Sequence, residues 1–302
     1  MDKRISHADQ HAYVRRYTLS GGESDGVRII ECDTGKIRFL LNESRALDIP
    51  QLWHEGENVS FLSKNGINAA ACDFSSRFEG GMLYTCGLDA IGGREGHELH
   101  GTIHTRPALV LSARCGKEGI FVEGIIREHA LFGRNLVLKR RVTAPAGGES
   151  VTIRDILANL GAKEEEYCLL YHVNLGYPFL AEGTTVKYDA EEVVPRTPLA
   201  GAHAADRTLF PAPEDNAEER CFFVRPRTPY AEAESPAGRR FLLSWTGETL
   251  PCMVQWVSPA SGDFALGLEP ATSFLDDRLT MKRIAPGEEV SFAVKITVSR
   301  SA

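Results

Sequence analysis

Apolar and polar residues alternate along much of this chain, and a period of two is typical of a β-strand with one buried face. The clearest case lies near the end of the sequence. There Val290, Phe292, Val294, Ile296 and Val298 alternate with Ser291, Ala293, Lys295, Thr297 and Ser299. Related patterns predict further strands at 108–113, 120–128, 136–143 and 151–160.

The first third of the chain is less regular. Residues 27–32 and 36–41 predict two strands of a hairpin around the turn Asp33-Thr34-Gly35. Residues 53–105 contain many glycines and few periodic runs, so we expect loops and short strands there. Residues 6–19 predict a short polar helix.

The segment 195–238 differs in composition from the rest. It contains Pro195, Pro198, Pro211, Pro213, Pro226, Pro229 and Pro236. Proline removes a backbone donor, so we expect an excursion from the sheet or a covering flap and no central strand. No linker, repeat or strand–helix alternation divides the chain. The pattern therefore favours one mainly all-β domain over 1–302, a large antiparallel β-sandwich with 1–25 as an N-terminal extension.

One strand, over 168–175, carries polar residues at a position typical of a binding site. Its faces hold Leu170, His172 and Asn174 on one side and Leu169, Tyr171 and Val173 on the other. Gly176 and Pro178 then end the strand. A polar pair just before a turn is where a site is often mounted on a rigid scaffold. A hydrogen-bonded core histidine is the alternative interpretation.

Composition limits the classes of function. The 302 residues are 43% hydrophobic and 25% charged, as in an ordinary soluble protein. The net charge of −7 argues against nucleic-acid binding as the main function. The sequence contains no run of ~18 apolar residues, so we expect no membrane span. The N-terminus does not resemble a signal peptide. Seven scattered cysteines without a C-x-x-C pair predict reduced thiols in the cytoplasm.

Serine-hydrolase, P-loop and dinucleotide-binding signatures are missing from the sequence. A first positive candidate is Arg77 before Gly80-Gly81, since an arginine can donate several hydrogen bonds to a polar ligand. Paired glycines permit positive φ or a close backbone approach. A surface arginine before a tight turn is the alternative.

Three closely spaced histidines, His97, His100 and His104, raise the question of zinc binding. Their spacing differs from H-E-x-x-H, and no helical pattern would bring the ligands together. A single functional histidine, His100 beside Gly101, is the favoured interpretation. A metal-assisted carbohydrate lyase or isomerase that uses the three histidines is the weaker alternative.

Glu269 ends the apolar strand around 264–268 and is a candidate base. In an apolar pocket the pKa of its carboxyl would rise, which suits proton transfer near neutral pH. A solvent-facing glutamate at the strand end is the alternative. With the histidines, Glu269 forms a set that fits proton transfer on a hydroxylated substrate.

Several ordered motifs resemble one family. They are Gly80-Gly81-Met82-Leu83-Tyr84-Thr85-Cys86-Gly87-Leu88, Leu99-His100-Gly101 with Pro107-Ala108, Tyr171-His172-Val173-Asn174-Leu175-Gly176-Tyr177-Pro178, and Gly267-Leu268-Glu269-Pro270. Over roughly 26–298 the chain resembles the DUF4432 family, which is related to the aldose 1-epimerases, or galactose mutarotases. The resemblance implies the galactose mutarotase-like β-sandwich.

The resemblance also implies roles for individual residues. Glu269 would be the general base at the anomeric hydroxyl, and His172 the general acid at the ring oxygen. His100 would hold the sugar near that oxygen, and Arg77 would bind its hydroxyls. Further substrate-binding candidates are Asn174, Arg45, Asp48 and Gln255, the last as a substitute for the family's acidic residue.

The implied activity needs no cofactor, because only protons move, and its partner would be a small sugar. The chain departs from classical mutarotases at Thr102, where they have a second glycine, and in the residues after His172. A non-catalytic carbohydrate-binding or sensing protein on the same scaffold is the alternative, because fold does not fix function.

Overall fold

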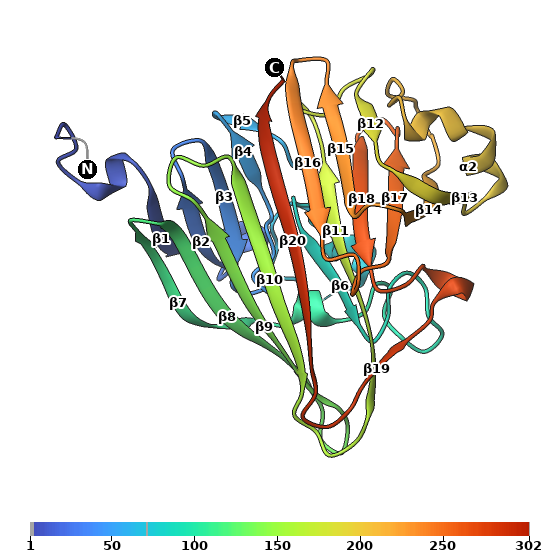
Figure 1. Cartoon of the computed structure of the whole chain (residues 1–302), viewed down its shortest axis with the longest axis horizontal. Coiled ribbons are helices and arrows are strands. Elements are labelled where there is room, and N and C mark those ends of the chain that lie inside the picture. Colours follow the sequence, from blue (N-terminus) through green and yellow to red (C-terminus); the bar gives the residue numbers. More distant parts are fainter. Residues whose placement is uncertain (1–2, 71, 302) are drawn as a thin grey trace.

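Antiparallel β-sheet accounts for most of the fold in this computed structural model, which describes residues 3–70 and 72–301 (Figure 1). Three sheets form in this part of the chain. The five-stranded sheet runs in the order β1 (Tyr13–Thr18), β2 (Arg28–Asp33), β3 (Ile37–Asn42), β4 (Leu52–His54) and β5 (Glu57–Asn58).

Two larger sheets form the body of the molecule. The eight-stranded sheet has the order β12 (Thr185–Lys187), β15 (Tyr230–Ser235), β16 (Arg239–Trp245), β20 (Glu289–Arg300), β10 (Ser150–Asn159), β9 (Asn135–Ala144), β8 (Gly119–His129) and β7 (Ala108–Gly116). The seven-stranded sheet has the order β13 (Ala190–Pro195), β14 (Arg220–Pro226), β17 (Cys252–Ser258), β18 (Ala265–Ala271), β11 (Glu165–Leu175) and β19 (Lys282–Ile284), and β6 (Tyr84–Leu88) pairs with β11.

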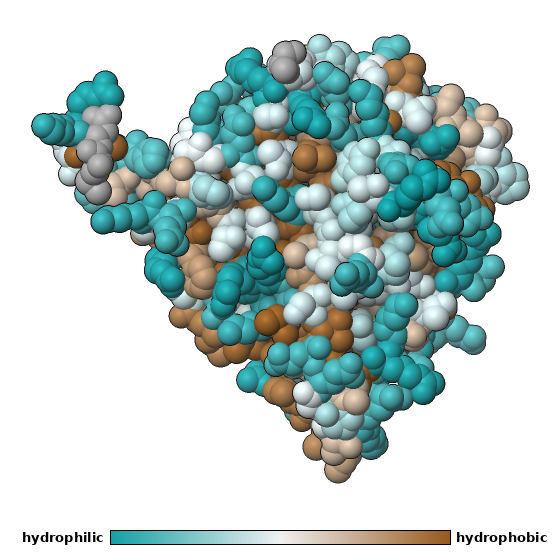
Figure 2. Space-filling view, viewed as in Figure 1, coloured by the Kyte–Doolittle hydropathy of each residue, from teal (hydrophilic) through white to brown (hydrophobic). Residues whose placement is uncertain are grey.

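Helices are short in the described residues. They are α1 (Phe74–Arg77), α2 (Pro198–Ala202) and the 3₁₀ turns Ala8–Gln10, Gly22–Ser24, Ile103–Thr105, Ala204–Arg207 and Asp276–Arg278. Among the residues that the structure places, no helix has the length and apolar character needed to cross a membrane. Figure 2 shows that one broad face mixes hydrophilic and neutral residues with scattered apolar ones.

The main core lies between the two large sheets and follows the predicted alternation. Val294 and Ile296 of β20 are buried on one side of this core, and Leu268 of β18 is buried on the other. These residues belong to one continuous cluster of buried apolar side chains. The predicted all-β antiparallel sandwich is therefore confirmed, as are the hairpin of β2 and β3 and the long strands β7 to β10.

A buried charge network crosses this core. The Arg140 guanidinium on β9 donates to Asp155 Oδ2 at 2.7 Å and to Asp48 Oδ1 at 2.7 Å. The hydroxyl of Tyr171 on β11 also donates to Asp155, at 2.7 Å, and Thr85 of β6 donates to Asp48 through its backbone N–H at 2.8 Å. Each buried carboxylate thus has partners, as buried charges require, and the network links both large sheets.

Two predictions about local structure are wrong. Residues 6–19 do not form one polar helix, because β1 occupies Tyr13–Thr18 and pairs with β2. The polar side chains of this edge strand face solvent, so its backbone pairs although its composition resembles a surface helix. Part of the expected N-terminal extension, 1–25, therefore belongs to a sheet.

The second wrong prediction concerns 195–238. Its first part, with α2 and a 3₁₀ turn, does leave the sheets, but its second part forms β14 and β15. Both strands have neighbours on each side, β13 and β17 for the first, β12 and β16 for the second. Pro226 is the last residue of β14, and Pro229 and Pro236 flank β15, so these prolines interrupt neither ladder.

Candidate active site

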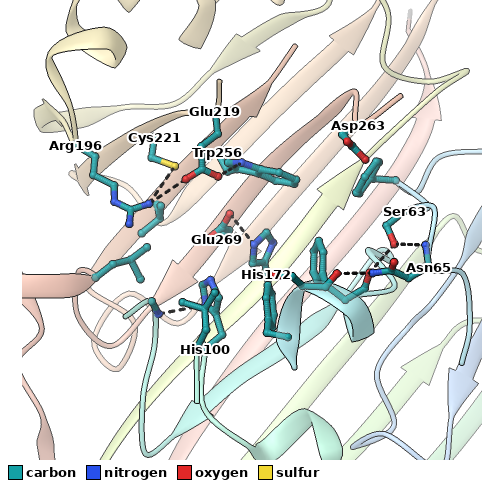
Figure 3. A pocket seen from close by; sticks show the side chains of 18 of the residues that line it. Ser63, Asn65, His100, His172, Arg196, Glu219, Cys221, Trp256, Asp263 and Glu269 are labelled. Carbon is teal, nitrogen blue, oxygen red and sulfur yellow. Dashed lines mark hydrogen bonds and ion pairs between the residues drawn. The ribbon is translucent and has the colours of Figure 1, made fainter. Parts of the chain in front are cut away.

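A cavity of about 510 Å³ opens on the seven-stranded sheet, on the face turned away from the main core (Figure 3). Strand alternation selects the residues that line it. On β17, Trp256 lines the cavity, whereas its neighbour Val257 joins the main core. On β18, Glu269 lines the cavity, whereas Leu268 joins that core. The cavity is therefore built on rigid strands, which suits a catalytic constellation.

Aromatic side chains form much of the cavity wall, and they are Phe61, Phe74, Phe78 and Trp256. The Trp256 ring packs edge-to-face against Phe61, with centroids 5.9 Å apart, and lies 5.5 Å from the His172 ring. Aromatic faces beside polar groups can hold a ligand that has both apolar C–H surfaces and hydroxyls.

His172 and Glu269 meet at the centre of this cavity. β11 and β18 pair in a register with Leu170↔Ala271 and Val173↔Leu268, which brings His172 opposite Glu269. His172 Nε2 lies 3.4 Å from Glu269 Oε1, and the two residues are only 6% and 1% exposed. The predicted acid and base are thus side by side and shielded from bulk water.

Burial raises the pKa of the Glu269 carboxyl well above 4.5; the nearby Glu219 carboxylate raises it further, and Arg196 lowers it. Glu269 Oε1 accepts no hydrogen bond from the described residues. Gly267 leaves room for this carboxyl group, because a Cβ there would lie 2.4 Å from Oε1. Glu269 therefore holds a proton to a higher pH than an exposed glutamate does, and its Oε1 faces the cavity without a hydrogen-bond donor among the described residues.

Asn174 orients the His172 ring. Its Nδ2 donates to the backbone oxygens of Gly81, at 3.0 Å, and His172, at 3.1 Å. Asn174 Oδ1 therefore faces His172 Nδ1, at 2.5 Å, and accepts its hydrogen. Nε2, the other ring nitrogen, is left facing Glu269. Burial, with a smaller contribution from His100, lowers the pKa of His172 to about 3, so the free ring is neutral.

His100 enters the cavity from a loop and has a left-handed backbone conformation, with φ of 62°. The backbone N–H of Gly92 donates to His100 Nδ1 at 3.2 Å, which places the hydrogen of the neutral ring on Nε2. Burial, and then Arg196, lower the pKa of His100 to about 4. His100 is thus a neutral donor, and its ring centroid lies 5.7 Å from that of His172.

Arg77, predicted to bind sugar hydroxyls, does not line the cavity. Its guanidinium donates to the backbone oxygen of Cys72 and to His104 Nε2, the latter at 3.1 Å. Gly80 and Gly81 adopt positive φ, as predicted. With these partners, Arg77 lines a second cavity, which it shares with Arg45 and Glu98.

Three other predicted binding residues also lie away from the cavity. Arg45 donates to the backbone oxygen of Asn68 at 2.9 Å, and Asp48 is engaged by the buried network described above. Gln255 Nε2 donates to the backbone oxygen of Arg207 at 2.8 Å, because on β17 it lies on the opposite face from Trp256. Arg45, Asp48 and Gln255 therefore form hydrogen bonds within the protein and do not line this cavity.

The three histidines considered as zinc ligands do not converge. His97 is exposed, His100 faces the cavity and His104 is buried beside Arg77. Residues 3–70 and 72–301 contain no group of three or more His, Cys, Asp or Glu side chains arranged to hold a metal ion.

Sequence patterns did not indicate Arg196, Glu219 or Trp256, which also line the cavity. Arg196 and Glu219 are the first and last residues between β13 and β14, the part of the proline-rich segment that leaves the sheets. Only the folded path of the chain brings them beside Glu269 (Figure 3). The alternation along β17 indicates that Trp256 and Val257 lie on opposite faces. It does not indicate which of the two faces is the core.

Sequence comparison identifies the family. A family model described as a domain of unknown function, DUF4432, matches residues 24–298. The chain belongs to the DUF4432 family. This membership confirms the resemblance inferred from the ordered glycine, histidine and glutamate motifs. A search of curated proteins finds no match for this DUF4432 protein.

Solved structures share the fold of the DUF4432 protein. A candidate aldose 1-epimerase from Klebsiella pneumoniae has a TM-score of 0.89 and 21% identity, over 99% of this chain and 85% of that one. A galactose mutarotase-like protein from Clostridium acetobutylicum has a TM-score of 0.71 and 15% identity, over 96% and 99%. Galactose 1-epimerase from Lactobacillus acidophilus has a TM-score of 0.68 and 13% identity, over 96% and 99%. At these identities the similarity establishes the mutarotase-like fold.

Proposed function

We propose that this protein is a carbohydrate isomerase that interconverts sugar anomers by general acid–base catalysis, as an aldose 1-epimerase does. The observation that carries the proposal is the buried pair of His172 and Glu269, 3.4 Å apart on the cavity floor. The names of the structural neighbours agree with it. A cytoplasmic location and a sugar ligand are parts of the same proposal.

The reaction uses both members of the pair. The Glu269 carboxylate takes the proton of the anomeric hydroxyl as the C1–O1 bond becomes a carbonyl. The bond between C1 and the ring oxygen breaks, and that oxygen takes a proton from His172 Nε2. Rotation about C1–C2 and reversal of these steps close the ring in the other configuration. No proton or electron is consumed overall.

One proton shared by His172 and Glu269 is enough for this cycle. A neutral His172 beside a protonated Glu269 holds the same number of protons as a charged His172 beside an ionised Glu269. Moving one proton within the pair produces the reactive acid and base. A sugar favours the second form because its anomeric O–H donates to the carboxylate and its ring oxygen accepts from Nε2.

The test is anomer exchange followed by NMR after fresh α-aldoses are added to the protein. Glu269→Gln should lower kcat by about 10²- to 10⁴-fold, the usual contribution of a general base, and should retain sugar binding by calorimetry. Glu289→Gln, at an exposed position on β20, is the matched control.

Two outcomes would count against the proposal. If no sugar in a panel of neutral, acidic and phosphorylated aldoses exchanges faster with the protein, the isomerase function is rejected. Saturable sugar binding without exchange would instead identify a carbohydrate-binding or sensing protein.

A further inference from the structure

Arg196 reaches the cavity from the segment that follows β13, and two carboxylates hold it. Its Nε donates to Asp276 Oδ2 at 2.7 Å, and its Nη1 donates to Glu219 Oε1 at 3.2 Å. The side chain is 31% exposed and lines the cavity. Because two anchors hold one planar group, its orientation is fixed before any ligand arrives.

The Nη2 atom of Arg196 is not used by this arrangement. Among the residues that the structure places, none accepts a hydrogen bond from it. The guanidinium, which lines the cavity, therefore keeps the two N–H donors of Nη2 without an acceptor among the described residues. Two donors on one nitrogen can each bond to a hydroxyl oxygen of a ligand.

Glu219 connects Arg196 to the aromatic wall. Its Oε1 accepts from Arg196, and its Oε2 accepts from the indole N–H of Trp256 at 2.9 Å. The Trp256 ring in turn lies 5.5 Å from the ring of His172. Arg196, Glu219 and Trp256 thus form one connected wall that is positioned relative to the reacting pair (Figure 3).

Arg196 also lies close enough to act electrostatically on the reacting groups. It contributes to the lowered pKa of His100 and opposes the raised pKa of Glu269. Because Arg196 and Glu269 line the same cavity, a sugar held at Glu269 shares that cavity with the guanidinium.

Each cation that lines the cavity is already balanced by acidic groups. Arg196 contacts both Glu219 and Asp276, and Lys64 Nζ lies 2.9 Å from Asp263 Oδ2. No uncompensated positive charge among the described lining residues could offset the desolvation of a carboxylate or phosphate. The wall offers hydrogen bonds without excess positive charge.

We propose that Arg196 contacts the substrate and, with Glu219, sets specificity for an uncharged sugar by binding its hydroxyls. This inference rests on the proposed function for the identity of the ligand as a sugar. It assigns the hydroxyl-binding role to the proline-rich segment, in place of Arg77 and Gln255.

The experiment compares Arg196→Gln with Arg225→Gln, an exposed arginine on β14 that is paired with Glu192 and does not line the cavity. Binding of neutral aldoses is measured by calorimetry, and anomer exchange by NMR. Arg196→Gln should raise Kd and KM about tenfold or more, because hydrogen bonds to a charged group are lost. The Arg225→Gln protein should match the wild type in both.

A second arm tests the charge argument. The wild-type protein should bind a neutral aldohexose at least tenfold more tightly than the uronic acid of the same stereochemistry. Glu219→Gln leaves Arg196 less compensated, so the variant should bind the uronic acid more tightly than the wild type does.

The outcomes separate this inference from the proposed function. If wild type and Arg196→Gln bind and exchange the same sugars equally well, the role of Arg196 is overturned and the isomerase function stands. Sugar binding that weakens in Arg196→Gln, in a protein without exchange activity, would keep the role of Arg196 and reject the isomerase. A wild-type preference for the uronic acid overturns the claim of an uncharged substrate, and failure to bind any sugar rejects both proposals.

Discussion

Asn174 Oδ1 lies 2.5 Å from Nδ1 of His172, two residues away on the same face of β11. The amide cannot turn over freely, because its nitrogen donates to the backbone oxygens of Gly81 and His172. This contact fixes which nitrogen of His172 carries hydrogen in the neutral ring. It makes Asn174 a positioning residue for the proposed acid, whereas the family resemblance implied that Asn174 binds the sugar.

Replacing Asn174 should change the pH dependence of the reaction. In Asn174→Asp a carboxylate beside the ring would raise the pKa of His172 above its value of about 3. We expect the acidic limb of the kcat profile, followed by NMR exchange, to move to higher pH. Asn174→Leu should lower kcat about tenfold by removing the acceptor, with KM little changed.

Asn216→Asp adds the same charge at an exposed turn and serves as the control. A profile in Asn174→Asp that coincides with that of the control would mean that the amide does not act through His172.

Periodicity predicts the strands and which residues of a strand share a face. It does not predict which of the two faces is turned toward the core and which toward the cavity. His172 lies within an apolar run and Glu269 follows one, and the family resemblance implied the roles of both. Gln255 and Trp256 are adjacent on β17, and only the position of the second sheet decides which of them faces the cavity. The sequence favoured Gln255 as the binding residue, but in the fold Trp256 faces the cavity.

Long side chains and irregular segments limited the prediction further. The sequence places the backbone of Arg77 beside the site, but the carbonyl of Cys72 and the ring of His104 turn its guanidinium away. Arg196 lies in a segment with no strand period, and its approach to Glu219 depends on tertiary structure. Such contacts between distant segments leave no local pattern.

Gly101 should be required for the position of His100. Its φ is 74°, and a Cβ there would lie 2.4 Å from the backbone oxygen of Gly87. Gly101→Ala should therefore destabilise the protein by more than the cost of the backbone conformation alone, about 1 kcal/mol, and should reduce exchange activity by displacing His100. Thermal unfolding and NMR exchange measure the two effects.

Gly96 is the matched control, since it has φ of 75° and no atom lies within 4 Å of the place that a Cβ would take there. Gly96→Ala should show the conformational cost only. Equal stability losses in the two variants would contradict the claim that close packing at Gly101 holds the loop.

His104 should make the stability of the protein sensitive to acid. Burial, and then Arg77, lower the pKa of His104 from 6.5 to about 2. The unfolded chain therefore binds a proton that the folded chain excludes, and stability falls as pH drops below about 6.5, by about 1.4 kcal/mol per pH unit for this group. His104→Gln removes this dependence, so its stability deficit against wild type should shrink between pH 6.5 and 4.5.

Urea unfolding at several pH values measures the difference. His97→Gln, at an exposed position of the same loop, is the control for replacing a histidine of this loop by glutamine. A deficit in His104→Gln that stays constant with pH would show that His104 takes up its proton without unfolding.

Arg140 and Arg141 are neighbours on β9 and should differ sharply in their contribution to stability. Arg140 is fully buried and binds both Asp48 and Asp155, so Arg140→Met leaves two buried carboxylates without a cation. Removing one member of a buried ion pair typically costs about 3–5 kcal/mol. Arg141 is paired with Glu123 at the surface, where its side chain is 47% exposed, so Arg141→Met should cost less than about 1 kcal/mol.

The origin of the Arg140 effect can be separated from lost packing. Methionine fills much of the same volume, so the expected loss comes mainly from the stranded charges. Adding Asp155→Asn to Arg140→Met removes one of those charges and should restore part of the stability in urea unfolding. If the double variant is as unstable as the sum of the two single variants, the charges of Arg140 and Asp155 do not interact.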